Sequence, residues 1–195
     1  AAATYTFFAE GGVTLDFDVT VRDLRTFDHL PRFGVQFTCP AGFERVRYFG
    51  RGPGASYADL RHSSRLGEFE TTANDNFEHY VRPQENMAHA DTKWMFVANM
   101  EGHGLLAAET DADFSFNCSH FTPKMLETTR HDYELKPLAD TVVNLDYRQD
   151  GIGSNSCGPE LLPEYRFSEK AFRFGIRLLP ALVNDVCPFE EAKQK

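Results

Sequence analysis

Apolar and polar residues alternate with a period of two in several segments of the chain. In the clearest segment every second residue from Val13 to Val21 is apolar, and most residues between them are Thr or Asp. Alternation of this kind indicates a β-strand with one buried face and one exposed face. The same pattern returns over residues 33–37, 114–118, 143–147 and 172–178. The sequence therefore predicts several strands of an antiparallel sheet.

Two further features indicate a β fold. Residues 4–9 are separated from the first alternating segment by Glu10-Gly11-Gly12, and glycine there allows the positive φ of a tight hairpin connection. Trp94 to Ala98 form a continuous apolar run, which is typical of a strand covered on both faces. Turn residues separate the predicted strands, over residues 40–42, 50–54, 102–104 and 151–159.

Only one segment, T-P-K-M-L-E-T-T-R-H at residues 122–131, has a helical pattern. Thr122 is suited to the N-cap, Pro123 to the first helical position, and Met125 with Leu126 to the buried side. The helix should be about two turns long. The expected fold class is all-β, an antiparallel β-sandwich with one short helix.

Charge and length narrow the possible partners. The 195 residues include 20 Lys and Arg against 29 Asp and Glu, a formal net charge of -9. This length suits a single domain over residues 1–195. An acidic surface disfavours nucleic acids and anionic lipids, because all of these are polyanions. No apolar run approaches the roughly 20 residues that a membrane-spanning helix needs.

The four cysteines, at positions 39, 118, 157 and 187, form no C-x-x-C pair. A closed structural zinc site is therefore not expected. A chain of this length does not need disulfide bonds to stabilise its core, so we expect reduced thiols in a cytoplasmic protein.

The segment G-I-G-S-N-S-C-G-P at residues 151–159 is rich in Gly, Ser and Asn and follows a predicted strand. A dinucleotide-binding loop has to open a helix, whereas Pro159 and Pro163 lead into another strand here. Two interpretations stay open: a simple tight connection, or a loop whose backbone and short polar side chains approach a ligand. Within it, Cys157 is either a small packing residue or a nucleophile that needs a nearby base.

Charged residues lie beside aromatic residues and tight turns in two other segments, residues 48–59 and 79–86. The charged residues in question are Arg51, Asp59, Arg82 and Glu85. These side chains are candidates for buried or half-buried ion pairs that hold loops in place. Carbohydrate binding is the alternative, since sugars bind to aromatic platforms and planar hydrogen-bonding side chains.

Six segments, in this order, resemble the C-terminal domain of β-galactosidases of glycoside hydrolase family 2, which also occurs as the small subunit of two-chain β-galactosidases. They are L-P-R-F-G at 30–34, Y-F-G-R-G-P at 48–53, Y-V-R-P-Q-E-N at 80–86, F-S-F-N-C-S-H-F-T at 114–122, H-D-Y-E-L at 131–135 and L-D-Y-R-Q-D-G-I-G-S-N-S-C-G-P at 145–159. The chain departs from the family's pattern over residues 55–60 and at Met87, where the family usually has Gly.

The resemblance implies a large antiparallel β-sandwich of galactose-mutarotase-like type. It also implies the activity of the full protein, which is hydrolysis of terminal non-reducing β-D-galactose residues. The family's two catalytic glutamates belong to an earlier barrel domain, and their motifs are missing here, so no residue of this chain is expected to be catalytic. Glu85 is not their equivalent, and the segment alone is expected to be inactive. The resemblance implies no cofactor in this segment and assigns any divalent metal of the full enzyme to another domain.

By the same resemblance, the expected substrate-binding residues are Asn155, Ser156 and Cys157. Cys157 occupies the position at which some relatives carry a Trp that stacks on the sugar, and a thiol offers far less apolar surface than an indole. Asn155 and Ser156 are suited to donate hydrogen bonds to sugar hydroxyl groups. The chain is thus expected to line the galactoside site and to support assembly of the enzyme.

The family's domain is longer at its N-terminal side, so we expect this chain to be a truncated domain of a larger β-galactosidase. Its expected partners are a galactoside and the remaining domains or the large subunit. Open sheet edges favour self-association as well. Two alternatives stay open: a stand-alone carbohydrate-binding module, and a mutarotase-like aldose epimerase whose acid and base would come from His79, His89 and Glu85.

Overall fold

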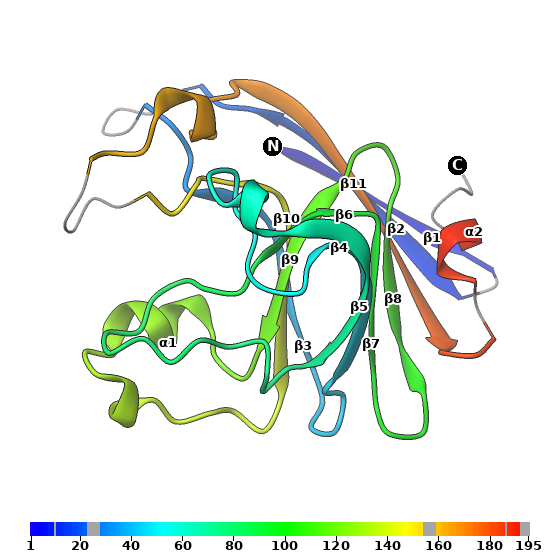
Figure 1. Cartoon of the computed structure of the whole chain (residues 1–195). Coiled ribbons are helices and arrows are strands. Elements are labelled where there is room, and N and C mark those ends of the chain that lie inside the picture. Colours follow the sequence, from blue (N-terminus) through cyan, green and yellow to red (C-terminus); the bar gives the residue numbers. More distant parts are fainter. Residues whose placement is uncertain (10, 23–27, 154–158, 186, 192–195) are drawn as a thin grey trace.

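In the computed structural model the chain forms two antiparallel β-sheets that pack face to face as a sandwich (Figure 1). The structure describes residues 1–9, 11–22, 28–153, 159–185 and 187–191. The expectation of an antiparallel all-β sandwich is confirmed at this level.

The larger sheet has seven strands, in the spatial order β1 (Ala2–Phe8), β2 (Gly12–Thr20), β11 (Ala171–Leu182), β8 (His103–Glu109), β7 (Trp94–Ala98), β4 (Arg45–Gly52) and β5 (Arg65–Thr72). The smaller sheet has four strands, in the order β3 (Arg32–Cys39), β10 (Thr141–Gln149), β9 (Phe114–Ser119) and β6 (His89–Thr92). β6 lies beside β4 as well, so that the two sheets approach each other closely at this point.

The alternating segments form strands with the predicted buried faces. In β2, Leu15 and Val19 are buried whereas Asp16 and Asp18 are exposed. The core between the sheets is apolar and takes side chains from both of them, because alternate residues of a strand point to opposite faces of its sheet. Its most deeply buried members are Ala73, Met95, Val97, Ala107, Phe116, Cys118, Val143, Leu145 and Ile176.

The continuous apolar run forms β7, and all five of its residues are buried as predicted. Met95 and Val97 belong to the core between the sheets. Trp94 and Phe96 point to the opposite face of the sheet, where they pack in a second cluster with Leu106. Both faces of this strand are therefore covered by apolar side chains.

The predicted hairpin joins β1 to β2, with Phe8 paired to Gly12. Gly11 has a φ of +97°, which is the conformation that glycine permits at this connection. β1 is the edge strand of the larger sheet, and all of its residues are exposed, including Tyr5 and Phe7.

The predicted helix is α1 (Pro123–Thr128). Thr122 is its N-cap, because the backbone N–H of Met125 donates to Thr122 Oγ1 at 3.2 Å. Leu126 is buried, whereas Met125 is only half-buried. The structure adds a four-residue helix near the C-terminus, α2 (Pro188–Glu191), and three single 3₁₀ turns at Arg61–Ser63, Asp132–Glu134 and Pro163–Tyr165. Within the described part of the chain, no helix has the length and apolar character to cross a membrane.

Candidate functional site

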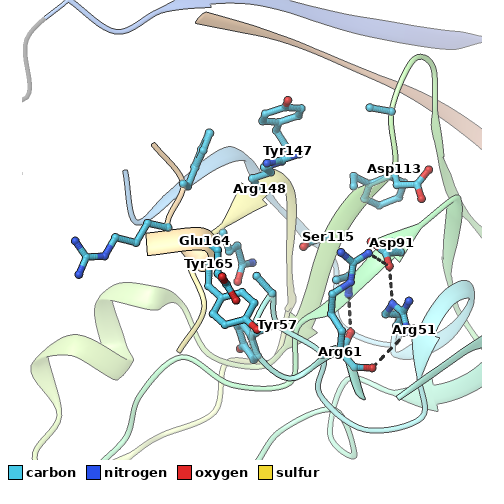
Figure 2. A pocket seen from close by; sticks show the side chains of 18 of the residues that line it. Arg51, Tyr57, Arg61, Asp91, Asp113, Ser115, Tyr147, Arg148, Glu164 and Tyr165 are labelled. Atoms are coloured by element: carbon cyan, nitrogen blue, oxygen red, sulfur yellow. Dashed lines mark hydrogen bonds and ion pairs between the residues drawn. The ribbon is translucent and has the colours of Figure 1, made fainter. Parts of the chain in front are cut away.

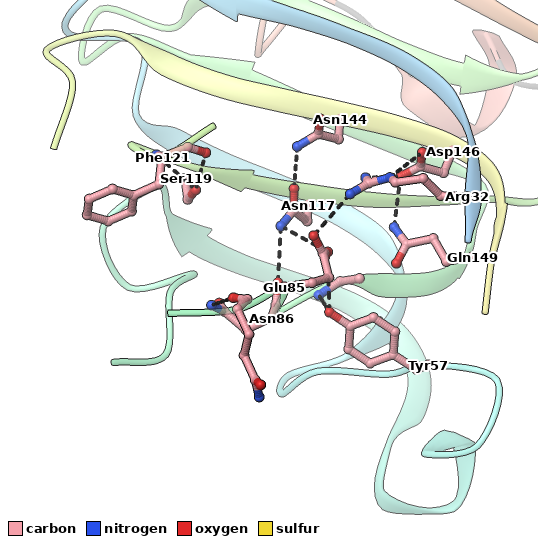
Figure 3. Close-up of polar contacts among 12 residues, drawn as sticks. Arg32, Tyr57, Glu85, Asn86, Asn117, Ser119, Phe121, Asn144, Asp146 and Gln149 are labelled. Carbon is pink, nitrogen blue, oxygen red and sulfur yellow. Dashed lines mark hydrogen bonds and ion pairs between the residues drawn. The ribbon is translucent and has the colours of Figure 1, made fainter. Parts of the chain in front are cut away.

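A network of polar side chains lies on the face of β9 and β10 that is turned away from the core (Figure 3). The alternation that sends Cys118 and Val143 inward sends Asn117 and Asn144 to this opposite face. Asn144 Nδ2 donates to Asn117 Oδ1 at 2.6 Å, and Asn117 Nδ2 donates to the carbonyl of Asn86 at 3.1 Å. The network thus binds the segment before β6 to the smaller sheet.

Arg32, at the start of β3, joins two carboxylates in this network. Its Nε donates to Asp146 Oδ1 at 3.1 Å, and its Nη1 donates to Glu85 Oε2 at 3.0 Å. The Asp146 side chain is only 4% exposed. Burial raises the pKa of both Asp146 and Glu85, while the Arg32 guanidinium acts in the opposite direction. The guanidinium is therefore what makes two charged carboxylates tolerable in this half-buried position.

The two segments that contain clustered charges meet at Tyr57. Its hydroxyl donates to Glu85 Oε1 at 3.4 Å and accepts a hydrogen bond from the backbone N–H of Ala88 at the same distance. Burial raises the pKa of Tyr57 well above its usual value, so that the hydroxyl stays protonated. Residues 48–59 and 79–86 are thus connected to each other, as the predicted loop-holding role requires.

Asp59 holds the beginning of the glycine-rich segment. Its carboxylate accepts hydrogen bonds from the backbone N–H groups of Ile152, at 3.1 Å, and Gly153, at 2.8 Å. A Cβ atom at Gly151 would lie 2.6 Å from Asp59 Cγ, so a glycine is needed for this close approach. The backbone N–H of Gly151 also donates to the carbonyl of Tyr165 at 3.1 Å. The base of this loop is therefore fixed by Asp59, which precedes Ile152 by 93 residues and Gly153 by 94 residues in the sequence.

The predicted substrate-binding residues Asn155, Ser156 and Cys157 lie outside the described residues. What the structure does describe is the segment up to Gly153, held by Asp59, and the chain from Pro159 onward. The prediction for these three side chains therefore stays a prediction.

A cavity of about 610 Å³ lies next to this loop base (Figure 2). At one side, Arg51 and Arg61 both form ion pairs with the carboxylate of Asp91, with 2.5 Å between Arg51 Nε and Asp91 Oδ2. Burial alone raises the pKa of Asp91, but the two guanidinium groups outweigh burial and lower the pKa below its usual value. Tyr57, which belongs to the polar network described above, also lines the cavity. So does Gln149, which joins the network because its Nε2 donates to Asp146 Oδ2 at 2.8 Å.

The other predicted charged residues differ in their roles. Arg51 forms the expected ion pair, and Glu85 pairs with Arg32. Asp59 holds a loop as expected, but through backbone N–H groups. Arg82 is exposed, so the expectation of a buried or half-buried ion pair is wrong for this residue.

The three side chains considered for a mutarotase-like reaction have separate partners. His89 is fully buried, where its Nε2 lies 2.7 Å from Asn76 Oδ1, and burial lowers its pKa to about 4. His79 is exposed and lies 2.8 Å from Asp132. Glu85 is held by Arg32 and Tyr57. The geometry gives these residues structural contacts rather than a shared reaction centre.

The described cysteines Cys39, Cys118 and Cys187 are free thiols. Burial raises the pKa of Cys39 to about 11, so this thiol stays protonated and packs as a small apolar side chain. Among the described residues, no group of three or more His, Cys, Asp or Glu side chains is arranged to hold a metal ion.

Several residues of the site were not singled out from the sequence, namely Arg32, Arg61, Asp91, Asn117 and Asp146. Asp146 and Asn117 do occupy the polar positions of alternating strands, which the pattern assigns to an exposed face. Recognising them as buried would have required knowing that residues 84–88 cover this face.

Comparison with known proteins decides the family. The family profile described as "Beta galactosidase small chain" matches residues 1–178. The chain belongs to the β-galactosidase small chain family. This result confirms the resemblance that the six sequence segments indicated.

Individual relatives are β-galactosidases from bacteria and yeast. The chain is 40% identical to the β-galactosidase of Staphylococcus xylosus over 168 residues, which are 86% of this chain and 16% of that protein. It is 36% identical to the enzyme of Actinobacillus pleuropneumoniae over 175 residues, 90% of this chain and 17% of the relative. It is 32% identical to the enzyme of Kluyveromyces lactis over 145 residues, which are 74% of this chain and 14% of that protein. The chain thus spans about a sixth of the length of these relatives.

Proposed function

We propose that this chain is the part of a β-galactosidase that completes the galactoside site, with the loop at residues 151–158 facing the substrate. Hydrolysis of terminal β-D-galactose residues is then carried out by the assembled enzyme, whose two catalytic glutamates come from the remaining domains or the large chain. We propose further that the sandwich is of galactose-mutarotase-like type. The small-chain family supports the assembly part of this proposal.

The observation that carries the proposal is the double hydrogen bond from Ile152 and Gly153 to Asp59. Gly, Ser and Asn permit close approach of the backbone to a ligand. The two hydrogen bonds fix the described start of this segment on a rigid framework, and a functional site built on such a framework is positioned more precisely. In this proposal Asn155 and Ser156 donate hydrogen bonds to sugar hydroxyl groups, while Cys157 contributes little stacking surface.

The chain's own carboxylates fit a structural role better than a catalytic one. Retaining hydrolysis needs one carboxyl group that donates a proton and a second that attacks the sugar, about 5 Å apart. Glu85 and Asp146 are instead joined through Arg32, whose guanidinium pairs with both. A carboxylate whose charge is compensated by a guanidinium is a weak nucleophile, so the chain alone is expected to be inactive.

The test combines the purified chain with the remaining part of the β-galactosidase and measures hydrolysis of a chromogenic β-galactoside. We expect no turnover by the chain alone and a gain in turnover when both parts are mixed. Turnover by the chain alone, abolished by Glu85→Gln, would overturn the proposal. The proposal would also be overturned if addition of the chain did not change the turnover of the catalytic part.

A second arm tests the loop. Cys157→Trp adds an aromatic surface, and in the mixed enzyme it should tighten binding of galactosides by about 1 kcal/mol, or roughly fivefold in KM. Cys187→Trp is the matched control, because Cys187 is an exposed thiol near the C-terminus. Equal KM values for both variants and the unmodified enzyme would mean that the loop does not face the substrate.

A further inference from the structure

The cavity beside Asp91 has the size of a small-molecule site, since pockets for small ligands span roughly 300–1,000 Å³. Its walls come from five separated parts of the chain: residues 51–62, the β6 strand with Asp91, residues 112–115 at the start of β9, the end of β10, and residues 164–167, which include part of the 3₁₀ turn Pro163–Tyr165. Figure 2 shows Arg61, Asp91 and Ser115 on one side, with Tyr165 and Glu164 across from them.

The charges around this cavity are compensated. Arg51 and Arg61 share Asp91, and Arg148 pairs with Glu169 at 2.7 Å. Arg166 pairs with Asp28 at 2.9 Å and lies 3.5 Å from Glu160. Each arginine thus has a carboxylate partner, and the chain as a whole carries a net charge of -9. An anionic ligand would find little net attraction here.

The cavity nevertheless offers many hydrogen-bonding groups. A guanidinium has five N–H donors, and the ion pairs with Asp91 and Glu169 engage Nη2 of Arg61 and Nη1 of Arg148. These two side chains are 48% and 59% exposed, so that their other N–H groups remain accessible. Ser115 adds a hydroxyl, and Asp113 adds a carboxylate that is 37% exposed.

Aromatic rings complete the lining. Tyr147 and Tyr165 are both half-buried at the cavity wall. The Tyr147 hydroxyl donates a hydrogen bond to Glu169 Oε2 at 3.0 Å, and the Tyr165 hydroxyl is hydrogen-bonded to the Glu164 carboxylate. The Tyr147 ring stacks on Phe172, with 4.7 Å between the ring centroids, and the Arg148 guanidinium lies over it. Tyr165 is therefore the ring whose face can offer apolar surface to a ligand in the cavity. A pyranose presents one apolar C–H face and a rim of hydroxyl groups that both donate and accept, which matches such a combination.

We propose that this cavity binds a neutral saccharide, with Tyr165 against the sugar ring and the guanidinium of Arg61 donating to its hydroxyl groups. The inference goes beyond the proposed function, which concerns the loop at residues 151–158, and uses that function only to choose galactosides as the first probes. It requires no other domain, so it can be tested on the 195-residue chain.

The test is an NMR titration of the ¹⁵N-labelled chain with methyl β-D-galactoside, lactose and, separately, inorganic phosphate. We expect saturable shifts with the sugars, at millimolar affinity, for residues that line the cavity. Arg61→Ala leaves Asp91 paired with Arg51 and should weaken binding about fivefold or more, as should Tyr165→Ala. Arg173→Ala and Tyr133→Ala are matched controls on exposed side chains elsewhere and should bind as the unmodified chain does.

Three outcomes would overturn the inference: no saturable shift with any sugar, saturable binding of phosphate without binding of sugars, or equal weakening by the variants and their controls. The spectrum of each variant shows directly whether it is folded. Because turnover of the mixed enzyme tests the proposed function separately, a chain that restores turnover but binds no sugar alone would contradict only this inference.

Discussion

On the seven-stranded sheet, the face turned away from the core carries Trp94, Phe96 and Leu106, whereas the corresponding face of the four-stranded sheet carries Asn117, Asn144 and Asp146. All six residues are buried. The first face is covered through apolar contact and the second through hydrogen bonds and an ion pair. The same strand geometry thus supports two chemically different outer layers.

The difference explains where the candidate site lies. Apolar burial is non-directional and stabilises any arrangement that removes surface from water. Hydrogen bonds and ion pairs require particular distances and angles, so they fix the partner in one position. The polar face therefore holds residues 85–88 and Tyr57 in place, and two residues after Tyr57 the chain presents Asp59 to the base of the loop.

The largest expected difference between the two faces follows from removing Arg32. Arg32→Ala leaves Asp146 and Glu85 without their shared cation, which should lower the free energy of unfolding by about 3–5 kcal/mol at pH 7. The loss should shrink at acid pH, because protonated carboxyl groups no longer need a cation. Urea denaturation over a range of pH measures both effects.

Phe96→Ala on the apolar face is the control for this prediction. Its cost should be similar, about 3–5 kcal/mol, because a large buried side chain is lost. That cost should not depend on pH, since no titrating group is involved. A pH-independent loss for Arg32→Ala would show that the polar face, too, acts mainly through packing.

His89 gives the second prediction. The unfolded chain takes up a proton near pH 6.5, whereas burial delays protonation of folded His89 to about pH 4. The contribution of neutral His89 to the free energy of unfolding is therefore fully present above pH 6.5. It is lost as the pH falls from 6.5 through 4, and the total loss is on the order of 3 kcal/mol. NMR titration of the imidazole should give a pKa near 4.

The hydrogen-bond partners of His89 sharpen this prediction. Asn76 Nδ2 donates to two backbone carbonyls, so its oxygen accepts from His89 Nε2, while Nδ1 lies 3.0 Å from both the Tyr48 hydroxyl and the backbone carbonyl of Arg51. The Arg51 carbonyl favours a proton on Nδ1 and so raises the pKa of His89, but burial is the larger cause and keeps the pKa low. A measured pKa close to 6.5 would mean that the buried polar layer contains water or is open.

A single substitution of similar size on each face should lower the free energy of unfolding by less than the changes above. Asn144→Leu removes a donor to Asn117 and should cost about 1–3 kcal/mol, because a buried acceptor loses its partner. Leu106→Met on the apolar face changes shape but not polarity and should cost less than about 1.5 kcal/mol. Denaturation midpoints of both variants measure the comparison, and the reverse order would contradict it.

Much of the fold could be predicted because the core positions of its strands are apolar. β4 was not predicted as a strand, since its inward positions are Val46, Tyr48, Gly50 and Gly52, and glycine gives no hydrophobic signal. A Cβ at Gly50 would lie 2.5 Å from Thr92 Oγ1, so the close approach of β6 explains this glycine. Hydrophobic periodicity detects positions that bury an apolar side chain, but it does not detect positions at which a glycine lets two backbones pack closely.

The candidate site could be predicted only in part. The charges near tight turns did indicate that Asp59 and Glu85 hold loops. Their partners, Gly153 and Arg32, are 94 and 53 residues away, and no local pattern encodes such pairings. The family resemblance indicates the loop at residues 151–158 as substrate-facing, which stays a prediction, and it carries no information about the contacts that fix the base of the loop.

The most direct test of whether the polar face positions the loop is the KM of the mixed enzyme for a chromogenic β-galactoside after Asp59 is replaced. Asp59→Ala removes two hydrogen bonds to the loop base and should raise KM about tenfold while the chain stays folded. Asp18→Ala, which removes an exposed carboxylate on β2, should leave KM unchanged. A KM that is the same for Asp59→Ala, Asp18→Ala and the unmodified enzyme would contradict the claim that the polar face positions a substrate-facing loop.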